Sequence, residues 1–451
     1  MQKYRGIRSR GHKRQRSRRA AVLVILAACL TLNLGFFPLS LSRADSPAVS
    51  TATSEGRLAV FDDVWQTIND RYYDANFHGV DWGAQRMRFR SQAAEARDQQ
   101  QLYGILRRLL TSLRDAHTRV YSPEEKFDWQ HPRFITVGLS LKEIEGQLAC
   151  VSVERGSEAE RAGIRAGDII ESIDGQPSMI RLQEKLLEQP DSSTPQAARL
   201  FAIGSLLNGV PGTVAHVEWR SSDNKLHKTS LTRRWYQRNP GLQIRYQGGV
   251  AIVTIDAFTH AIAADFARAA NSPGNKLREA RGLIIDLRGN GGGDAEAMAE
   301  IAGIFLPNAT GLGQFTDRLG NVSLKLETGG AVIYSARNLK PLRARIVVLA
   351  SERTSSAAEI FISALKQTNQ VTVIGGQTCG CVLAVRMHHT LPDGGDLAVS
   401  ELDYQTARGV RLEGNGIIPD IGVNQTRQGL YTGRDPFMDK AFTNLRRSSH
   451  H

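Results

Sequence analysis

The chain has 451 residues, of which 41% are hydrophobic and 23% are charged. This composition is typical of globular proteins and excludes a disulfide-dense mini-protein, a collagen-like repeat and a mostly disordered chain. The formal charge of +12 does not indicate nucleic-acid binding, because residues 1–44 hold ten Lys and Arg and no acidic residue. The remaining residues have a net charge of only +2, and they show no basic patch with interleaved aromatic residues.

Residues 1–44 have the pattern of an export signal. A basic stretch ends at Arg19, an apolar run covers residues 20–41, and Ser42-Arg43-Ala44 has the small-x-small form of a cleavage site. The alternative is an uncleaved signal anchor, because an apolar run of this length could span a bilayer. Either interpretation predicts a periplasmic or extracellular protein, associated with the membrane only if residues 20–41 stay attached.

Residues 45–133 are expected to form a helical domain. Apolar residues recur at helical spacing from Leu58 to Ile68 and again from Leu102 to Leu110. Within this segment only Thr118–Tyr121 has the pattern of a strand.

Residues 134–235 change to strand-like patterns, beginning with Phe134–Leu141 and Gly146–Val153. The string Gly156–Gly175 then encodes a short helix, a Gly-Asp turn, a strand and a hairpin, and it closely resembles a PDZ domain. The alternative is a small β-barrel without a peptide site. Residues 180–208 are predicted to form a helical insertion that a minimal PDZ domain would not contain.

The PDZ resemblance implies a site for the C-termini of peptides. Such a domain adds an extended peptide to its sheet edge and binds the terminal carboxylate with backbone N–H groups. The matching loop is Val137-Gly138-Leu139-Ser140.

Residues 236–427 alternate strand and helix patterns, which predicts an α/β domain. The expected strands are Val250–Ile255, Gly282–Leu287, Arg345–Ala350 and Val371–Ile374, and the expected helices are Ala261–Ala270, Ala295–Phe305 and Ala357–Lys366. Residues 428–451 are expected to hold one helix that begins at Asp435-Pro436. The predicted fold class is therefore α/β and multi-domain.

A glycine-rich turn, Gly289-Asn290-Gly291-Gly292-Gly293, follows the second of these strands and precedes a helix. Glycines allow close approach of the backbone to a ligand, and a helix N-terminus offers unpaired N–H groups. Such a turn suits a phosphate or a developing oxyanion. The phosphate interpretation is disfavoured, because no Lys-Ser/Thr pair follows the glycines and Asp294 and Glu296 would repel a nucleotide.

Ser356 lies at the next strand-to-helix junction, directly before the helix expected at Ala357. A serine at a sharp turn of this kind can expose its hydroxyl to a substrate. Ser356-x-x-Glu359 also fits a capping box, in which the serine only satisfies helix N–H groups. This segment alone leaves both interpretations open.

Taken in order, Asp115-Ala116-His117-Thr118, the PDZ string, the glycine-rich turn, the Ser356 junction and Glu413–Ile421 resemble the tail-specific (carboxy-terminal processing) protease superfamily. This superfamily also contains the tricorn-type core proteases. The resemblance implies a serine endopeptidase with a crotonase/ClpP-like core that acts on peptides or C-terminal regions of proteins. It implies Ser356 as the nucleophile and an oxyanion hole at the N–H groups of Gly291 and Ala357.

One departure from the family pattern concerns the general base. Processing proteases use a Lys where this chain has Cys381. Tricorn-type members use a His and a Glu instead, and His117 and Glu413 match those positions. The tricorn-type Ser before the His is Ala116 here, which removes the usual link to the carboxylate. The alternative to a Ser/His enzyme is a catalytically inactive scaffold that binds peptides through its PDZ domain.

Three cysteines remain outside the N-terminal segment, namely Cys150, Cys379 and Cys381. A bridge between Cys379 and Cys381 would close a strained ring around one glycine, so both are expected to be reduced thiols near the active site. His388-His389 could suggest zinc together with these cysteines, but Cys-x-Cys lacks the usual ligand spacing. We therefore expect no metal and no cofactor.

Overall fold

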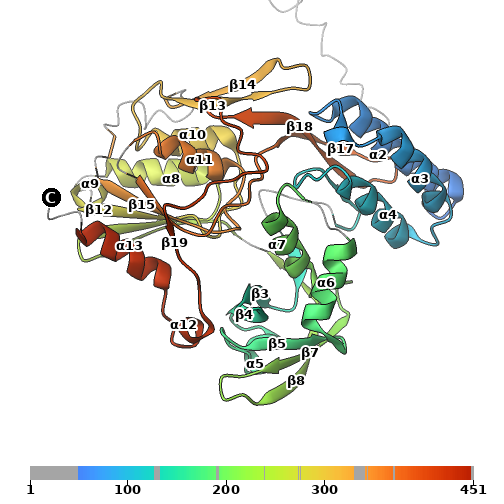
Figure 1. Ribbon diagram of the computed structural model, residues 1–451, viewed down its shortest axis with the longest axis horizontal. Helices are drawn as coiled ribbons and strands as arrows, with labels where there is room; N and C mark the ends of the chain where they lie inside the picture. Colours follow the sequence, from blue (N-terminus) through green and yellow to red (C-terminus); the bar gives the residue numbers. More distant parts are fainter. Residues whose placement is uncertain are drawn as a thin grey trace, which may run out of the picture. The chain divides into compact units, whose positions relative to one another are not determined.

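The computed structural model describes residues 49–447 except 126–132, 189–191, 238, 273, 275, 330–340, 343 and 369–370 (Figure 1). The predicted export signal lies outside the described residues. Within the part that is described, no helix is long and apolar enough to cross a membrane.

Three helices form the N-terminal part: α2 (Ser54–Arg71), α3 (Trp82–Ala94) and α4 (Gln99–Thr111), with a 3-10 turn, η1 (Phe77–Gly79), between the first two. Each of the three is capped by a side chain that accepts a hydrogen bond from an N–H of the first turn, at Thr53, Asp81 and Asp98. Their apolar faces pack on one another, as the periodicity predicts.

The PDZ domain is built on the sheet β3-β4-β5-β7-β8, in which β3 is an edge strand and the short β6 (Gln176–Pro177) pairs with β5. The bounds are β3 Leu139–Ile144, β4 Gln147–Val153, β5 Ile169–Ile173, β7 Val214–Arg220 and β8 Leu226–Thr232. Helix α5 (Glu158–Arg161) is followed by Gly163, whose φ of 89° is in the left-handed region. A glycine in this conformation is common just after the last residues of a helix.

The single strand expected over Phe134–Leu141 is wrong. The chain forms β2 (Arg133–Thr136), which pairs with β9 (Arg234–Gln237) in a separate two-stranded sheet, and β3 begins only at Leu139. Gly138 separates the two strands with a φ of 83°. The helical insertion is confirmed as α6 (Ser178–Glu188) and α7 (Pro195–Ser205).

The α/β core has a six-stranded sheet in the order β10-β11-β12-β15-β16-β19, parallel except for the antiparallel pair β10-β11. The strands are β10 Leu242–Gln247, β11 Val250–Ile255, β12 Gly282–Asp286, β15 Arg345–Ala350, β16 Val371–Gly375 and β19 Ile421–Gly422. The strands predicted for β11 and β15 are confirmed at both ends. Buried β-branched runs in these strands explain the fully covered sheet.

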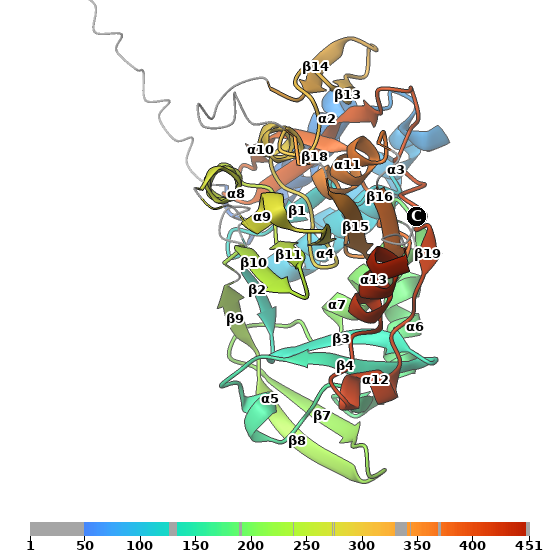
Figure 2. The same cartoon turned by 90° about the vertical axis from the view of Figure 1, so that its left-hand side faces the viewer.

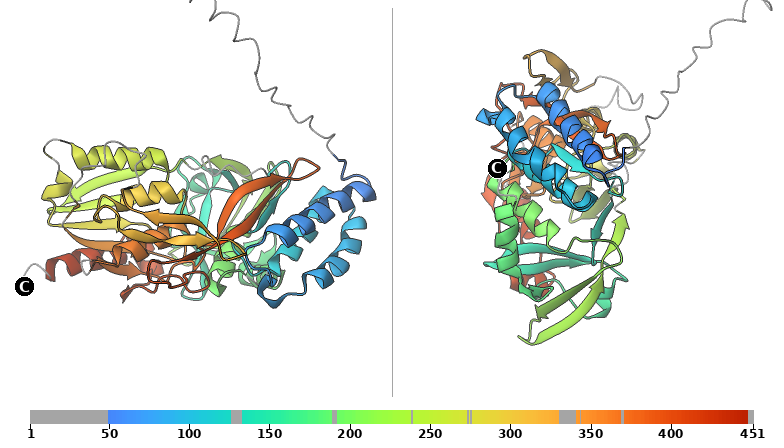
Figure 3. Two further views of the ribbon diagram at one scale, coloured as in Figure 1. Left: turned by 90° about the horizontal axis from the view of Figure 1, so that it is seen from above. Right: turned by 90° about the vertical axis from the view of Figure 1, so that its right-hand side faces the viewer.

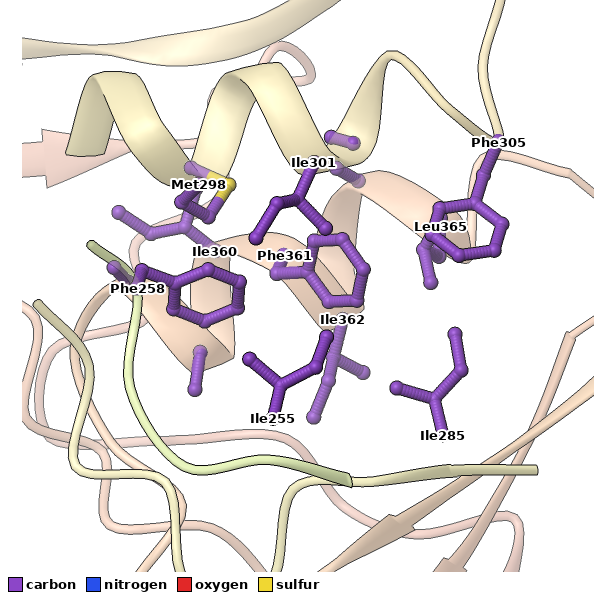
Figure 4. Close-up of a cluster of buried hydrophobic side chains, with 14 of the residues drawn as sticks. Ile255, Phe258, Ile285, Met298, Ile301, Phe305, Ile360, Phe361, Ile362 and Leu365 are labelled. Atoms are coloured by element: carbon purple, nitrogen blue, oxygen red, sulfur yellow. The ribbon is translucent and has the colours of Figure 1, made fainter. Parts of the chain in front are cut away.

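Helices cover both faces of this sheet (Figures 1 and 2). On one face lie α8 (His260–Asn271), α10 (Ala295–Ala302) and α11 (Ala357–Leu365), together with the short α9 (Lys276–Glu279). On the other face α13 (Pro436–Arg447) packs Phe437, Ala441 and Leu445 against the strands, and α12 (Arg427–Tyr431) precedes it. Figure 4 shows Phe361 of α11 among Phe258, Ile301 and Phe305, which fixes the helix that begins next to Ser356.

A second sheet has the order β1-β18-β13-β14, with β17 also paired to β18. Of this sheet, the sequence predicted only β1 and a strand position for His388-His389, which lie on β17. Its strands are β1 Arg119–Tyr121, β13 Gly311–Thr316, β14 Val322–Glu327, β17 Ala384–Thr390 and β18 Asp396–Gln405. The β17–β18 hairpin lies beside the N-terminal helices (Figure 3). Leu391, Leu397 and Val399 of this hairpin belong to the hydrophobic core of those helices. Because β1 pairs with β18, the chain just before β1 is held against the core domain.

Candidate active site

Ser356 occupies a strained turn between β15 and α11. Its φ and ψ are 57° and −126°, whereas Thr53 and Ser157, which cap other helices, have extended backbones. A non-glycine residue in such a conformation costs about 1–3 kcal/mol and marks a functional turn more often than a plain cap. The capping box is also present, with Glu359 Oε2 accepting from the Ser356 N–H at 3.1 Å. The turn therefore combines a helix cap with the geometry of a nucleophile elbow.

The glycine-rich turn lies directly against Ser356. A Cβ atom on Gly292 would lie 2.7 Å from Ser356 Cβ and 3.1 Å from the Ala357 nitrogen, and Gly292 has a φ of 99°. The N–H groups of Gly291 and Ala357 make no hydrogen bond within the described residues, while the Gly292 N–H is held by Asn290 Oδ1. Two free donors thus remain beside the serine, as an oxyanion hole requires.

Buried hydrogen bonds hold the two turns together. Thr354 Oγ1 donates to Leu287 O at 2.7 Å, and the Ser355 N–H donates to Asn290 O at 3.1 Å. The Asn290 side chain is fully buried and also donates to Ile255 O. Sequence reasoning missed Asn290 and Gly292, although both belong to the glycine-rich string.

Glu359 connects Ser356 to the loop that contains Cys381. Its carboxylate is fully buried. It accepts from the Thr378 hydroxyl at 2.5 Å and from the N–H groups of Gly380 and Cys381 at 2.8 and 2.9 Å, in addition to Ser356. Burial raises the pKa of Glu359, and the hydrogen bonds oppose this effect. Cys381 O in turn accepts from the Ser356 N–H at 2.8 Å.

Cys379 and Cys381 form a disulfide, so the expectation of two reduced thiols is wrong. Gly380 has a φ of 70°, and this turn brings the two Cα atoms to 5.2 Å, which is within the usual range for a disulfide. The expected location next to the serine is right. A disulfide sulfur carries no titratable proton, so Cys381 cannot replace the missing lysine as a base in this state. Cys150 is free and buried.

His117 lies between α4 and β1. Its N–H and the Thr118 hydroxyl both donate to Asp115, and Thr118 Oγ1 accepts from the Ser400 N–H of β18 at 3.0 Å. The Nδ1 atom of the His117 ring is buried and makes no hydrogen bond among the described residues. Burial lowers the pKa of His117, so the imidazole is neutral at neutral pH and can accept a proton.

Glu413 is buried and accepts from the N–H groups of Val382 and Leu383 at 2.6 and 3.2 Å, directly after the disulfide. Burial raises the pKa of Glu413 to about 7; a hydrogen bond from Ser193 lowers it and the charge of Asp115 raises it. Glu413 is not bonded to His117 Nδ1, which has no hydrogen-bond partner in the part of the chain that the structure describes.

Other residues singled out from the sequence have separate roles. His388 and His389 each bond a carboxylate of their own, Asp396 at 2.7 Å and Asp63 at 2.8 Å. Lys366 is the lysine nearest in the sequence to Cys381. It pairs with Asp420 at 2.6 Å, which leaves it no role as a substitute base.

The loop proposed to bind peptide carboxylates, Val137-Gly138-Leu139-Ser140, runs into the edge strand β3. A Cβ on Gly138 would lie 2.6 Å from Ser157 Cβ, so the loop is closely packed at the start of α5. Its N–H groups have not been shown to bind a carboxylate, and their assignment stays a prediction.

Comparison with known proteins gives one consistent result along the chain. Residues 249–423 match Peptidase family S41, residues 55–111 match the Tricorn protease C1 domain, and residues 151–195 match the PDZ domain. The chain is 27% identical to the carboxyl-terminal-processing protease of Synechocystis sp., covering 84% of each protein. It is 28% identical to the chloroplastic C-terminal processing peptidase of Tetradesmus obliquus, covering 82% of this chain and 77% of the relative.

Two solved structures share the fold. The photosystem II D1 C-terminal processing protease is 23% identical with a TM-score of 0.52, covering 82% of this chain and 93% of that protein. Mature CPAF complexed with lactacystin is 13% identical with a TM-score of 0.66, covering 86% and 97%. The fold and the matched domains define a serine-type peptidase with a PDZ domain. The matched domains and the relatives named C-terminal processing peptidase support assignment of the chain to the tail-specific, or C-terminal processing, protease family.

Proposed function

We propose that this protein is an exported serine endopeptidase that cleaves peptides or C-terminal regions of exported proteins. Ser356 is the nucleophile, His117 the general base and Glu413 the carboxylate that supports the base. The observation that carries this proposal is the strained Ser356 turn, which lies beside the free N–H groups of Gly291 and Ala357. An intact turn of this kind disfavours the inactive-scaffold alternative.

The proposed reaction is acyl transfer through these residues. Ser356 Oγ attacks the scissile carbonyl carbon while His117 takes the hydroxyl proton, and the carbonyl oxygen gains the negative charge. The N–H groups of Gly291 and Ala357 stabilise that oxyanion. His117 then gives its proton to the leaving amine as the C–N bond breaks. Water hydrolyses the acyl-enzyme by the same sequence of steps and regenerates Ser356.

His117 is proposed as the general base because the other candidate residues are engaged elsewhere. The residue at the lysine position of the family is Cys381, whose sulfur is in the disulfide, and Lys366 is engaged with Asp420. A neutral imidazole has the proton affinity that the step needs near neutral pH. Export is proposed from the signal-like residues 1–44.

The PDZ domain is proposed to select substrates by their C-termini. Because backbone N–H groups would bind the terminal carboxylate, we expect a peptide with an apolar, free C-terminus to bind at least about tenfold more tightly than its amidated form. The measurement is calorimetric titration of both peptides into the Ser356→Ala variant, which prevents cleavage. Equal affinities would contradict carboxylate capture and leave the domain an edge-strand or structural role.

A further inference from the structure

The helical insertion of the PDZ domain reaches the catalytic region through the residues just before α7. Thr194 caps α7 by accepting from the Ala197 N–H, and the same hydroxyl donates to Cys379 O at 2.6 Å. Thr194 is buried, and its Cγ2 atom would lie 2.8 Å from a Cβ on Gly380. Ala197, Cys379 and Cys381 share a small apolar cluster. The start of α7 is therefore packed on the disulfide loop.

Ser193, the residue before this cap, contacts two parts of the proposed catalytic machinery. Its Oγ accepts from the Ala116 N–H at 3.1 Å, in the residue before His117. The Ser193 side chain also interacts with the Glu413 carboxylate, whose pKa it lowers. The backbone is close as well, because Ser193 O lies 3.8 Å from the position of a Cβ on Gly414.

The proposed catalytic centre needs a residue that links Glu413 to the His117 segment. Glu413 makes no hydrogen bond to the Nδ1 atom of His117, and Ala116, next to the histidine, has no hydroxyl to connect them. A hydroxyl can donate one proton and accept another hydrogen bond at the same time. Ser193 uses both capacities, one toward the carboxylate and one toward the backbone of the histidine segment.

From these contacts, and on the basis of the function proposed above, we propose that Ser193 of the PDZ insertion is a positioning residue that joins Glu413 to the His117 segment and so completes the catalytic centre. Its side chain comes from a different domain than Glu413 or Ser356. The insertion then has a role in catalysis that is independent of peptide capture by the β3 edge.

The titratable groups around this link determine what its loss would do. Asp115 raises the pKa of Glu413, and the Ser193 hydroxyl lowers it. Burial raises the pKa of the Tyr72 and Tyr73 phenols, and the charges of Asp115 and Glu413 raise it further, so both phenols remain neutral. If the Ser193 hydroxyl is removed, the Glu413 carboxylate loses a hydrogen-bond donor but remains close to the negative charge of Asp115. The pKa of Glu413 should therefore rise further.

The variant Ser193→Ala tests the proposal in the full chain. We expect kcat on a peptide substrate to fall about tenfold at pH 7, with KM changed less than about twofold. The acid limb of the kcat profile should move up by about one pH unit, since more Glu413 is protonated at any given pH. Ser192→Ala, one residue earlier, is the matched control and should behave as the wild type. In a Glu413→Gln background, Ser193→Ala should cause no further loss.

Two results would overturn the proposal while leaving the proposed function intact. One is a Ser193→Ala enzyme with wild-type kcat and acid limb, when Glu413→Gln is impaired. The other is a loss that is equal at every pH and accompanied by a raised KM or a lowered melting temperature, which indicates a structural role. If Glu413→Gln itself keeps full activity, the proposed function loses its carboxylate, and the role of Ser193 falls with it.

Discussion

His117→Ala is expected to reduce kcat/KM on a peptide substrate by at least about ten-thousand-fold, close to the loss caused by Ser356→Ala. A serine hydroxyl is a weak nucleophile unless a neighbouring base takes its proton in the transition state. Burial keeps the His117 imidazole neutral at neutral pH. Steady-state hydrolysis of an unfolded substrate with an apolar C-terminus measures the effect.

The pH dependence follows from the two proposed partners of Ser356. His117 has a pKa below its ordinary value, whereas burial raises the pKa of Glu413 to about 7. Activity requires both groups unprotonated, so the rate should rise with pH through about 7, following the group with the higher pKa. A rise only at the alkaline pH where a lysine deprotonates would contradict the assignment of the base.

Two variants make the His117 result specific. The double variant Ser356→Ala/His117→Ala should be no worse than either single variant, because the pair acts as one unit. His389→Ala removes a half-buried imidazole on β17 that is bonded to Asp63 of α2, and this variant should keep most of the activity. A His117→Ala enzyme with substantial activity would show that another group takes the serine proton.

Glu359→Ala is expected to lower the free energy of unfolding by about 3 kcal/mol or more. It is also expected to lower the peptidase activity. The carboxylate is fully buried and accepts four hydrogen bonds, from Ser356, Thr378, Gly380 and Cys381. Truncation removes this buried acceptor from the Thr378 hydroxyl and from the N–H groups of Gly380 and Cys381, and it opens a cavity. The Ser356 N–H keeps only Cys381 O as its acceptor. The Ser356 turn and the disulfide loop would both lose their common support. Urea unfolding followed by fluorescence, together with peptidase assays, gives the two readouts.

Glu352→Ala is the matched control for this variant. Glu352 lies in the loop between β15 and α11. It is partly exposed and pairs with Lys142 at 2.8 Å. Partly exposed ion pairs contribute about 1 kcal/mol or less, so its unfolding midpoint should change little. Glu359→Gln should lie between the two, because the amide keeps the shape but turns a donor toward backbone N–H groups. A Glu359→Ala protein with the wild-type midpoint would refute the supporting role.

The α/β core was predictable from the sequence because its signals are local. Val250–Ile255 and Arg345–Ala350 are predominantly apolar runs of strand length, and both form strands over those same residues. The PDZ domain was predictable from the glycines and turn residues of Gly156–Gly175. In these segments the local residue pattern is sufficient to predict the secondary structure.

The second sheet could not be predicted in the same way. Strand β18 pairs with its hairpin partner β17 and also with β1 and β13, which come from distant positions in the chain. Such pairing depends on tertiary contacts that periodicity does not show. The division of Phe134–Leu141 into two strands was missed for a related reason. Only the positive φ of Gly138 and the pairing with β9 reveal it.

For the candidate site, the sequence indicated the residues but not their connections. Ser356 and the glycine-rich turn were identified, yet the strained φ of the serine is a backbone property that composition does not encode. Glu359 was considered only as a helix cap. Ser193 carries no motif at all, and its contact with Ala116 arises only when the insertion folds against the core. The disulfide was missed because the turn at Gly380 was not foreseen.

The most direct test of the central claim is the reaction of the purified protein with a fluorophosphonate probe at neutral pH, with the adduct located by mass spectrometry. An activated serine beside an oxyanion hole reacts with such a probe, whereas an ordinary helix-capping serine does not. We predict one adduct, on Ser356, that is absent in Ser356→Ala and nearly absent in His117→Ala. Labelling that persists in Ser356→Ala, or wild-type protein that is never labelled, would contradict Ser356 as an activated nucleophile.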